Sequence, residues 1–125
     1  MPPTIAILGA SANRSKYGNR AVRAYARLGY QVFPIHPREE TIEGHPVYRS
    51  VLDVPAAALD KVSFYVPPTI GLLLIDDVAR KPVREVWFNP GAESAELIER
   101  ARQLGLNVIV ACSIVAVGIS PYDLD

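Results

Sequence analysis

The sequence predicts a doubly wound α/β fold, in which helices cover both faces of a mostly parallel, five-stranded sheet. Short apolar segments alternate with longer segments whose apolar residues recur at helical spacing. The short segments lack the apolar-polar alternation of a half-exposed antiparallel sheet, which indicates parallel strands covered on both faces. With 125 residues, 50% of them hydrophobic, the chain is expected to form a single domain over residues 1–125.

The first half of the chain begins with a predicted strand, helix and strand. TIAIL (4–8) is the first strand, and the segment 17–28 is a helix with Gly29 just past its end. The inward face of this helix is expected to hold Val22, Tyr25, Ala26 and Leu28. YQVFPI (30–35) is the second strand. The polar segment 38–50 that follows is expected to be a loop with at most a short edge strand.

The second half continues the alternation. KVSFYV (61–66), VREVWF (83–88) and NVIVAC (107–112) are the third to fifth strands. Between the first two of these, the apolar segment 69–81 follows a pair of prolines, which are well placed at the start of a helix. The segment 93–105 has the clearest helical pattern, with one apolar face made of Leu97, Ile98, Ala101 and Leu104.

Charge is distributed unevenly, although the formal net charge is zero. Residues 1–38 contain no acidic residue and six basic ones: Arg14, Lys16, Arg20, Arg23, Arg27 and Arg38. This segment could form a local positive field for an anion, and the alternative is that three of these arginines make a solvated helix face. A nucleic-acid partner is not expected, because it would require a larger net positive charge with aromatic residues among the basic ones.

The sequence also predicts a cytoplasmic protein with no membrane partner. The amino-terminal segment MPPTIAILGA has no basic leader before an apolar core, and the longest nearly apolar run, 108–119, is shorter than the ~20 residues of a bilayer-spanning helix. The lone Cys112 cannot form an internal disulfide, which agrees with a reducing compartment. Its thiol is interpreted as a buried structural group, with a reactive thiol as the alternative.

The segment GASANRSKYG (9–18) occupies the first strand-to-helix turn, where doubly wound folds direct backbone N–H groups and the positive end of a helix at a phosphate. Gly9 permits a tight turn, and small, hydroxyl and basic residues follow it: Ala10, Ser11, Ala12, Arg14, Ser15 and Lys16. The segment matches neither G-x-G-x-x-G nor the G-K-[ST] ending of a nucleoside triphosphatase loop. A turn that only connects two elements is therefore the alternative.

The end of the second strand indicates the type of nucleotide. A site for NAD places an acidic residue there to bind the ribose hydroxyls, whereas this chain has His36 and Arg38, which suit a phosphorylated ribose as in NADP or coenzyme A. Hydrolysis is not favoured, because GASAN lacks the second glycine of G-x-S-x-G and no histidine follows in the usual order. A metal site is not expected, because His36, His45 and Cys112 lack ligand spacing.

Three parts of the sequence together resemble the CoA-binding domain family, whose best-known member is the amino-terminal domain of the succinyl-CoA synthetase α subunit. They are ILGASANRSKYGNRAVRAYARLGYQVFPIHP, VSFYVPP, and VWFNPGAES with GLNVIVACSI. The resemblance extends over nearly the whole chain. It implies a Rossmann-like fold with coenzyme A as the ligand.

The resemblance also implies a role for each part of the site. The first loop would receive the CoA phosphates, a basic residue after the second strand would approach the adenosine phosphate, the Val-Pro turn would lie against the nucleotide, and the fourth-strand turn would lie nearer the pantetheine. In the synthetase subunit, a lysine stands a little further along where this chain has PREE (37–40). The implicated residues are Gly9, Ser11, Ala12, Asn13, Arg14, Ser15 and Lys16 in the loop, His36, Pro37 and Arg38 after the second strand, Val66, Pro67 and Pro68 in the Val-Pro turn, and Asn89, Pro90 and Gly91 in the fourth-strand turn.

The resulting expectation is a non-catalytic, single-domain protein that binds coenzyme A or an acyl-CoA. In the synthetase the phosphohistidine lies in a second domain, which this chain is expected to lack. Two alternatives remain open. One is an NADP-type dinucleotide-binding protein or oxidoreductase, with His36, Tyr17, Tyr65 and Tyr122 as the available proton donors. The other is a scaffold that contacts a protein partner differently when CoA is bound.

Overall fold

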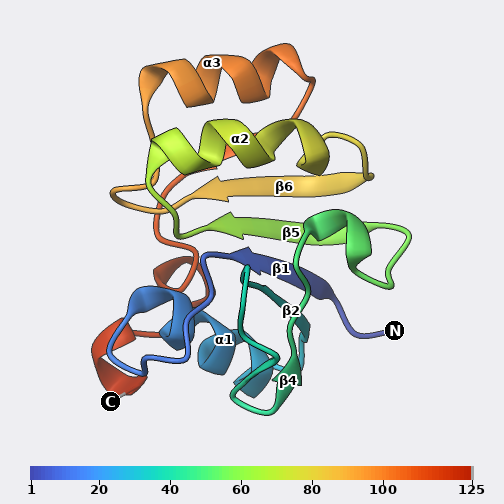
Figure 1. The fold of residues 1–125 in the computed structure, drawn as a ribbon. Helices are drawn as coiled ribbons and strands as arrows, with labels where there is room; N and C mark the ends of the chain where they lie inside the picture. Colours follow the sequence, from blue (N-terminus) through green and yellow to red (C-terminus); the bar gives the residue numbers. More distant parts are fainter. Residues whose placement is uncertain (125) are drawn as a thin grey trace.

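The computed structural model describes residues 1–124 and is built on a sheet of five parallel strands (Figure 1). Their order across the sheet is β2-β1-β5-β6-β7, so the chain places β2 on one side of β1 and β5 on the other. All neighbouring strands pair in parallel, so their carboxyl ends lie along one edge of the sheet. The strands are β1 (Thr4–Leu8), β2 (Gln31–Ile35), β5 (Leu59–Phe64), β6 (Val83–Phe88) and β7 (Val108–Val110).

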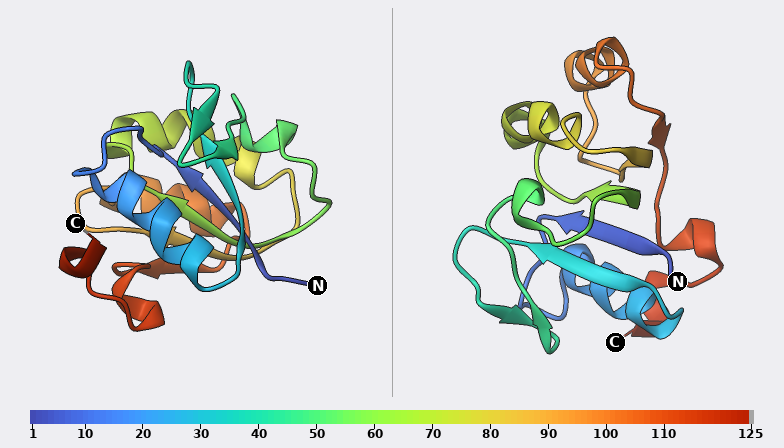
Figure 2. Two further views of the ribbon diagram at one scale, coloured as in Figure 1. Left: turned by 90° about the horizontal axis from the view of Figure 1, so that it is seen from below. Right: turned by 90° about the vertical axis from the view of Figure 1, so that its right-hand side faces the viewer.

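Three helices cover the two faces of the sheet (Figures 1 and 2). Helix α1 (Tyr17–Arg27) lies on one face, and α2 (Pro68–Val78) and α3 (Ala95–Gln103) lie on the other. Proline at the first position of α2 and the Ser94 hydroxyl, which accepts a hydrogen bond from the Leu97 amide at the start of α3, fix where these helices begin. The predicted doubly wound α/β architecture is confirmed.

Two details of the prediction are corrected. Leu28 was expected on the inward face of the first helix, but it is 45% exposed because α1 ends at Arg27. The polar segment 38–50 is more ordered than a loop with one edge strand, since it forms an antiparallel hairpin of β3 (Thr41–Ile42) and β4 (His45–Pro46). A short 3-10 helix, η1 (Val51–Asp53), leads from there towards β5.

The segment after β7 turns back towards α1 (Figure 2). It contains two 3-10 helices, η2 (Val115–Val117) and η3 (Pro121–Leu124). The Arg23 guanidinium in α1 donates hydrogen bonds to the carbonyls of Leu124 and Arg14, which ties this segment and the first turn to the helix. The carboxyl-terminal segment therefore lies beside the amino-terminal end of α1.

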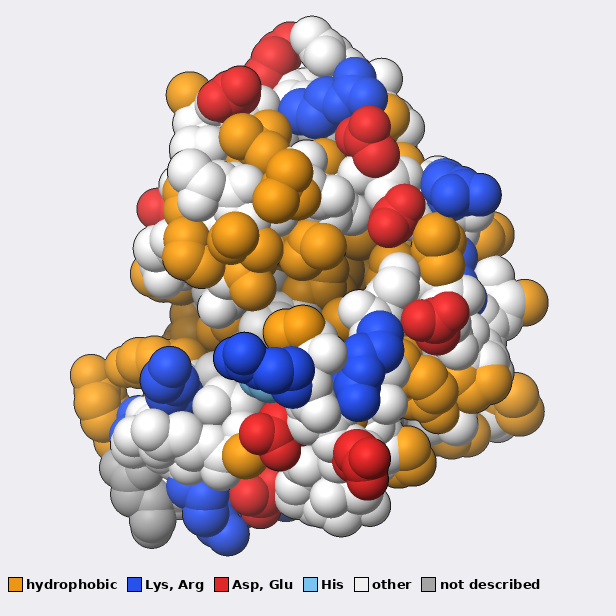
Figure 3. All heavy atoms as spheres, in the orientation of Figure 1, with side chains coloured by type: hydrophobic (Ala, Val, Ile, Leu, Met, Phe, Trp, Pro, Cys, Tyr) orange, Lys and Arg blue, Asp and Glu red, His pale blue; other side chains and the backbone are white. Residues whose placement is uncertain are grey.

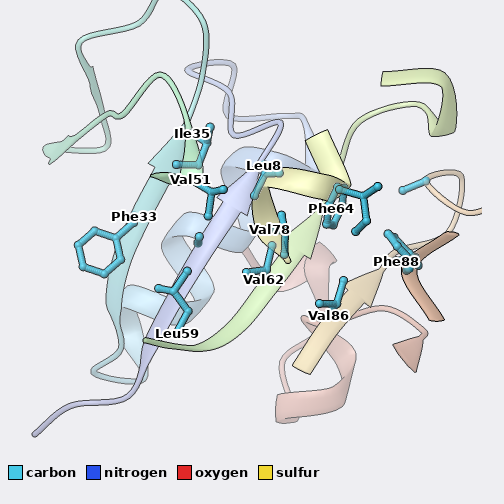
Figure 4. Packing of buried hydrophobic residues seen from close by; sticks show 14 of the residues in the cluster. Leu8, Phe33, Ile35, Val51, Leu59, Val62, Phe64, Val78, Val86 and Phe88 are labelled. Atoms are coloured by element: carbon cyan, nitrogen blue, oxygen red, sulfur yellow. The ribbon is translucent and has the colours of Figure 1, made fainter. Parts of the chain in front are cut away.

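The core consists of one apolar layer on each face of the sheet. The larger layer packs the strands against α2 and α3 and includes the rings of Phe64 and Phe88, whose centroids are 5.0 Å apart (Figure 4). The smaller layer packs β1 against α1 through Ile5, Ile7 and Val22, all fully buried. Burial of each such side chain stabilises the fold by about 1.5–3 kcal/mol, which holds the carboxyl edge of the sheet in place.

Candidate ligand-binding cleft

A cleft of about 760 Å³ lies along the carboxyl edge of the sheet. Its walls include residues that follow four adjacent strands: His36 after β2, Gly9 after β1, Tyr65 after β5 and Pro90 after β6. Because neighbouring strands are about 4.8 Å apart, these four ends span roughly 14 Å. Figure 3 shows this hollow with apolar side chains above it and Lys and Arg side chains below. Ligands of doubly wound folds bind at this edge.

The cleft brings together most of the predicted site residues. Those that line it are Gly9, Ser11, Ser15, Lys16, His36, Pro37, Val66, Pro67, Pro90 and Gly91. Other predicted residues neighbour them in the chain without lining the cleft: Ala12, Asn13, Arg14, Arg38 and Pro68. Asn89 lines a neighbouring cavity instead. Five further residues line the cleft but were not predicted from the sequence to bind CoA: Tyr17, Gly18, Tyr65, Ile70 and Ala92.

The first turn is shaped by hydrogen bonds within it. The Ser11 hydroxyl accepts from the Asn13 amide at 3.1 Å, and the Asn13 side-chain carbonyl accepts from the Ser15 amide at 3.0 Å and the Ser15 hydroxyl at 2.7 Å. The Asn13 backbone carbonyl accepts from the Lys16 amide. Asn13 therefore positions the loop, while Ser11, Ser15 and Lys16 line the cleft.

Two glycines allow the turn to approach its neighbours closely. Gly9 has a φ of +88°, and a Cβ there would lie 2.7 Å from the Tyr65 carbonyl oxygen. A Cβ on Gly18 would lie 2.2 Å from the Gly9 carbonyl oxygen. In the dinucleotide fingerprint the third glycine allows this helix-strand contact. Here the contact is made nine residues after Gly9, so the fingerprint spacing could not have found it.

The amino-terminal end of α1 supplies positive potential to the cleft. Lys16 is the residue before the helix, and its side chain makes no capping hydrogen bond at this end. The first turn of α1 also contains no acidic residue, and its residues Tyr17 and Gly18 line the cleft. Free first-turn N–H groups and the helix dipole favour an anion there.

Arg14 points to a different neighbour. Its guanidinium lies 3.4 Å from a carboxylate oxygen of Glu43 in the β3-β4 hairpin, and the Arg14 side chain is 66% exposed. The predicted contact of Arg14 with a phosphate therefore stays a prediction, and it would require this side chain to exchange Glu43 for the ligand.

The end of β2 is held by an arginine that the sequence analysis did not single out. The His36 Nδ1 accepts hydrogen bonds from the amides of Arg38 and Glu39, both at 3.0 Å, which leaves the ring proton on Nε2. The Arg49 guanidinium donates to the carbonyls of His36, Arg38 and Glu39 at 3.2, 3.2 and 2.5 Å. His36 thus lines the cleft as a fixed N–H donor, and Arg38 lies beside it on the constrained loop.

A second cavity of about 310 Å³ adjoins the cleft near the ends of β6 and β7. Tyr17, Tyr65 and Pro90 line both spaces. The remaining walls of the second cavity are Asn89, Cys112, Val115, Pro121 and Tyr122. A side-chain hydrogen bond with Tyr122 raises the pKa of Tyr17, linking α1 to the carboxyl-terminal segment.

A buried polar network lies behind the wall that the two spaces share. The Asn89 side-chain N–H donates to the Ser63 hydroxyl at 2.8 Å, and the Asn89 side-chain carbonyl accepts from the Ser113 amide at 2.8 Å. The hydroxyls of Ser63 and Ser113 are 2.8 Å apart, and the Tyr65 hydroxyl is 3.0 Å from that of Ser113. Burial raises the pKa of Tyr65, so its hydroxyl stays neutral and can act as a hydrogen-bond donor.

Residues 1–124 contain no group of three or more His, Cys, Asp and Glu side chains arranged to hold a metal ion. No helix in the same part of the chain has both the length and the apolar character needed to cross a membrane.

The fold and cleft together define a Rossmann-like α/β domain with a candidate phosphate turn between β1 and α1. The sequence agrees, because residues 3–118 match the model of the CoA binding domain. The chain belongs to this family.

Known relatives include both isolated domains and larger enzymes. A conserved hypothetical protein from Pyrococcus furiosus is 33% identical, with a TM-score of 0.82 over 91% of this chain and 98% of that one. A dinucleotide-forming acetyl-coenzyme A synthetase from Ca. Korarchaeum cryptofilum, solved with phosphate and ADP, is 31% identical, with a TM-score of 0.74 over 86% of this chain and 25% of that one.

Curated relatives are ADP-forming acetate–CoA ligases. The Archaeoglobus fulgidus ligase I is 27% identical over 118 residues, which is 86% of this chain and 17% of the ligase. The α subunit of the Pyrococcus furiosus ligase II is 27% identical over 119 residues, which is 86% of this chain and 26% of the subunit. The chain therefore spans 17% and 26% of the length of these two relatives and corresponds to their CoA-binding domain.

Proposed function

We propose that this chain binds coenzyme A without catalysing a reaction on it. One observation carries the proposal: a single cleft crosses the ends of four strands, from His36 and the basic first turn to the apolar turn at Pro90 and Gly91. A ligand with charge at one end and a long, weakly polar arm at the other suits such a cleft. Family membership supports coenzyme A as that ligand.

The diphosphate is proposed to bind at the first turn. The open end of α1 and the Lys16 ammonium provide positive charge, and the Ser11 and Ser15 hydroxyls line the same wall. Hydrogen bonds between such groups and a phosphate are charge-assisted, so they are stronger than bonds between neutral groups. The small residue at Ala10 leaves room for the phosphates close to the backbone.

The adenosine end is proposed to lie near His36 and Pro37. An acidic residue at this place would bind a bare ribose diol, and the chain has instead the Nε2–H of His36 with Arg38 on the adjacent constrained loop. This arrangement favours a ribose that carries a phosphate. We assign the 3′-phosphate of coenzyme A to Arg38.

The hydrogen bonds and burial of His36 and Tyr65, two side chains that line the cleft, support a binding role without catalysis. The His36 Nδ1 is occupied by two backbone amides, and among residues 1–124 no serine or cysteine forms a hydrogen bond with this ring. The Tyr65 hydroxyl is held neutral by burial. The cleft thus lacks the paired nucleophile and base that acyl transfer requires, within the part of the chain described.

Isothermal titration at one fixed salt concentration tests the proposal, with CoA, dephospho-CoA, NADP and NAD as ligands. Preferential binding of CoA is expected, and Arg38→Ala should narrow the preference for CoA over dephospho-CoA. A preference for NADP would favour the oxidoreductase alternative. Absence of binding to all four ligands would overturn the proposal. Pull-down with and without CoA then tests whether a protein partner binds this chain differently when CoA is present.

A further inference from the structure

The second cavity is the continuation of the cleft at the end away from the nucleotide. The cleft starts beside His36 at the end of β2 and reaches Pro90 at the end of β6, and the cavity continues to Cys112 beyond β7. Tyr17 and Tyr65 line both spaces, so the two spaces adjoin at these rings. A CoA with its diphosphate at the first turn would direct its sulfur towards this cavity.

The lining of the second cavity suits an uncharged, mostly apolar group. Among residues 1–124, no charged side chain lines it, and Val115, Pro121 and the tyrosine rings provide apolar contact. The amide of Asn89 is already used, since its N–H groups donate to Ser63 and to the Phe64 carbonyl and its oxygen accepts from the Ser113 amide. The cavity holds about 310 Å³, equivalent to roughly ten water molecules at about 30 Å³ each. This is room for a short chain.

The buried network gives the Tyr65 hydroxyl a partner that can donate to it. The Ser63 oxygen accepts from Asn89, and either of the Ser63 and Ser113 hydroxyls can donate to the other. When Ser63 donates to Ser113, the Ser113 proton can be donated to the Tyr65 oxygen. Ser63 and Ser113 are fully buried, so each hydroxyl proton needs a partner inside the protein. In this arrangement the proton of Tyr65 is available to a ligand in the space that this ring lines.

We infer that the second cavity receives the acyl group of a short-chain, uncharged acyl-CoA, with the Tyr65 hydroxyl donating a hydrogen bond to the thioester carbonyl. This inference rests on the proposed function, because the CoA moiety must occupy the cleft. It goes further by naming acyl-CoA, and not free CoA, as the preferred ligand. Tyr65 is well placed for this role, because it stands at the junction where the sulfur would leave the cleft.

Titration with four related ligands tests the inference: CoA, butyryl-CoA, malonyl-CoA and the thioether S-butyl-CoA, all with reductant present because Cys112 lines the cavity. Each buried methylene strengthens binding about fourfold, so two in the cavity should make butyryl-CoA bind roughly 15-fold more tightly than CoA. Malonyl-CoA should bind no more tightly than CoA, because its carboxylate would lose water without a partner. Equal affinities for CoA and butyryl-CoA would overturn the inference while the proposed function stood. Failure of every ligand to bind would instead overturn the proposed function.

A pair of variants separates the cavity from general surface effects. Val115 lines the cavity and is 58% exposed, so Val115→Asp should fold, leave CoA binding unchanged and abolish the advantage of butyryl-CoA. Leu73→Asp is the matched control, since Leu73 is 74% exposed on α2 and lines neither space. It should keep the full preference. An unchanged preference in Val115→Asp would overturn the inference.

The thioether tests the role of Tyr65 directly, because S-butyl-CoA lacks the carbonyl oxygen. Wild-type protein should bind butyryl-CoA more tightly than S-butyl-CoA by about tenfold, the value of one hydrogen bond near 1.4 kcal/mol. Tyr65→Phe should bind the two ligands equally, and a purely structural role of Tyr65 would not change their ratio. An undiminished ratio in the variant would refute the assigned hydrogen bond, and the Val115 pair still tests the cavity if this variant does not fold.

Discussion

Gly18→Ala is the substitution that most directly tests how the cleft is built. Gly18 lies in the first turn of α1, and the Cβ of an alanine there would lie 2.2 Å from the Gly9 carbonyl oxygen and 3.1 Å from the Gly9 carbonyl carbon. Both are backbone atoms of the turn that is proposed to hold the CoA diphosphate. To restore an ordinary contact of 3.4 Å, α1 or the turn would have to move by more than 1 Å.

The magnitude follows from two opposing effects. Inserting a methyl group into a well-packed contact costs about 1–3 kcal/mol, and this site is at the upper end because the neighbour is backbone. Alanine regains up to about 1 kcal/mol through its higher helix propensity. We expect a net loss of about 2 kcal/mol in the free energy of unfolding, seen as a decrease of roughly 5–10 °C in Tm. A displacement of 1 Å in the turn should also weaken CoA binding by at least tenfold.

Gly71→Ala in α2 is the matched control for the assay. Its Cβ would meet the Leu97 Cδ2 at 2.7 Å, which is the end of a flexible side chain that can move away. Thermal unfolding should therefore show a change within about 1 kcal/mol, and titration should show unaltered CoA binding. If Gly18→Ala matched this control in both Tm and CoA affinity, the close contact between α1 and the turn would not be what shapes the site.

Three further predictions concern charged residues. Lys16→Ala should weaken CoA binding about tenfold and reduce its salt dependence, because Lys16 lines the cleft. Arg14→Ala should weaken CoA binding less than threefold, because Arg14 is paired with Glu43 and does not line the cleft. Titration of each variant with CoA at two salt concentrations checks both predictions. Arg49→Ala should release three carbonyls of the loop after β2, and should speed amide exchange there and lower CoA affinity severalfold. The hydrogen bond to Arg100 lowers the pKa of Asp76, so at neutral pH the wild-type protein should have a higher free energy of unfolding than Asp76→Asn. This difference should disappear as the pH falls through the folded-state pKa of Asp76. Chemical denaturation of both proteins across pH 2–7 checks the prediction.

The sequence by itself determined the fold class and the place of the first turn. The apolar run at 4–8 coincides with β1, because a strand buried on both faces needs continuous apolar residues, and the segment 83–88 coincides with β6. Gly9, Ser11 and Lys16 were predicted to share one site because they follow β1 directly, and they do line one cleft. Such features depend on the local pattern of residue types, which can be recognised in a single sequence.

The tertiary structure decided which distant residues meet. Gly18 contacts Gly9 across a loop longer than the dinucleotide fingerprint allows, and Arg14 pairs with Glu43 in a hairpin that no pattern predicted. The second cavity exists only because the segment after β7 returns to α1, which brings Tyr122 near Tyr17 and lets the buried hydroxyl of Ser113 meet that of Tyr65. These contacts join parts of the chain that are remote in sequence. They depend on the order of strands in the sheet and on the packing of its faces, which residue periodicity does not specify.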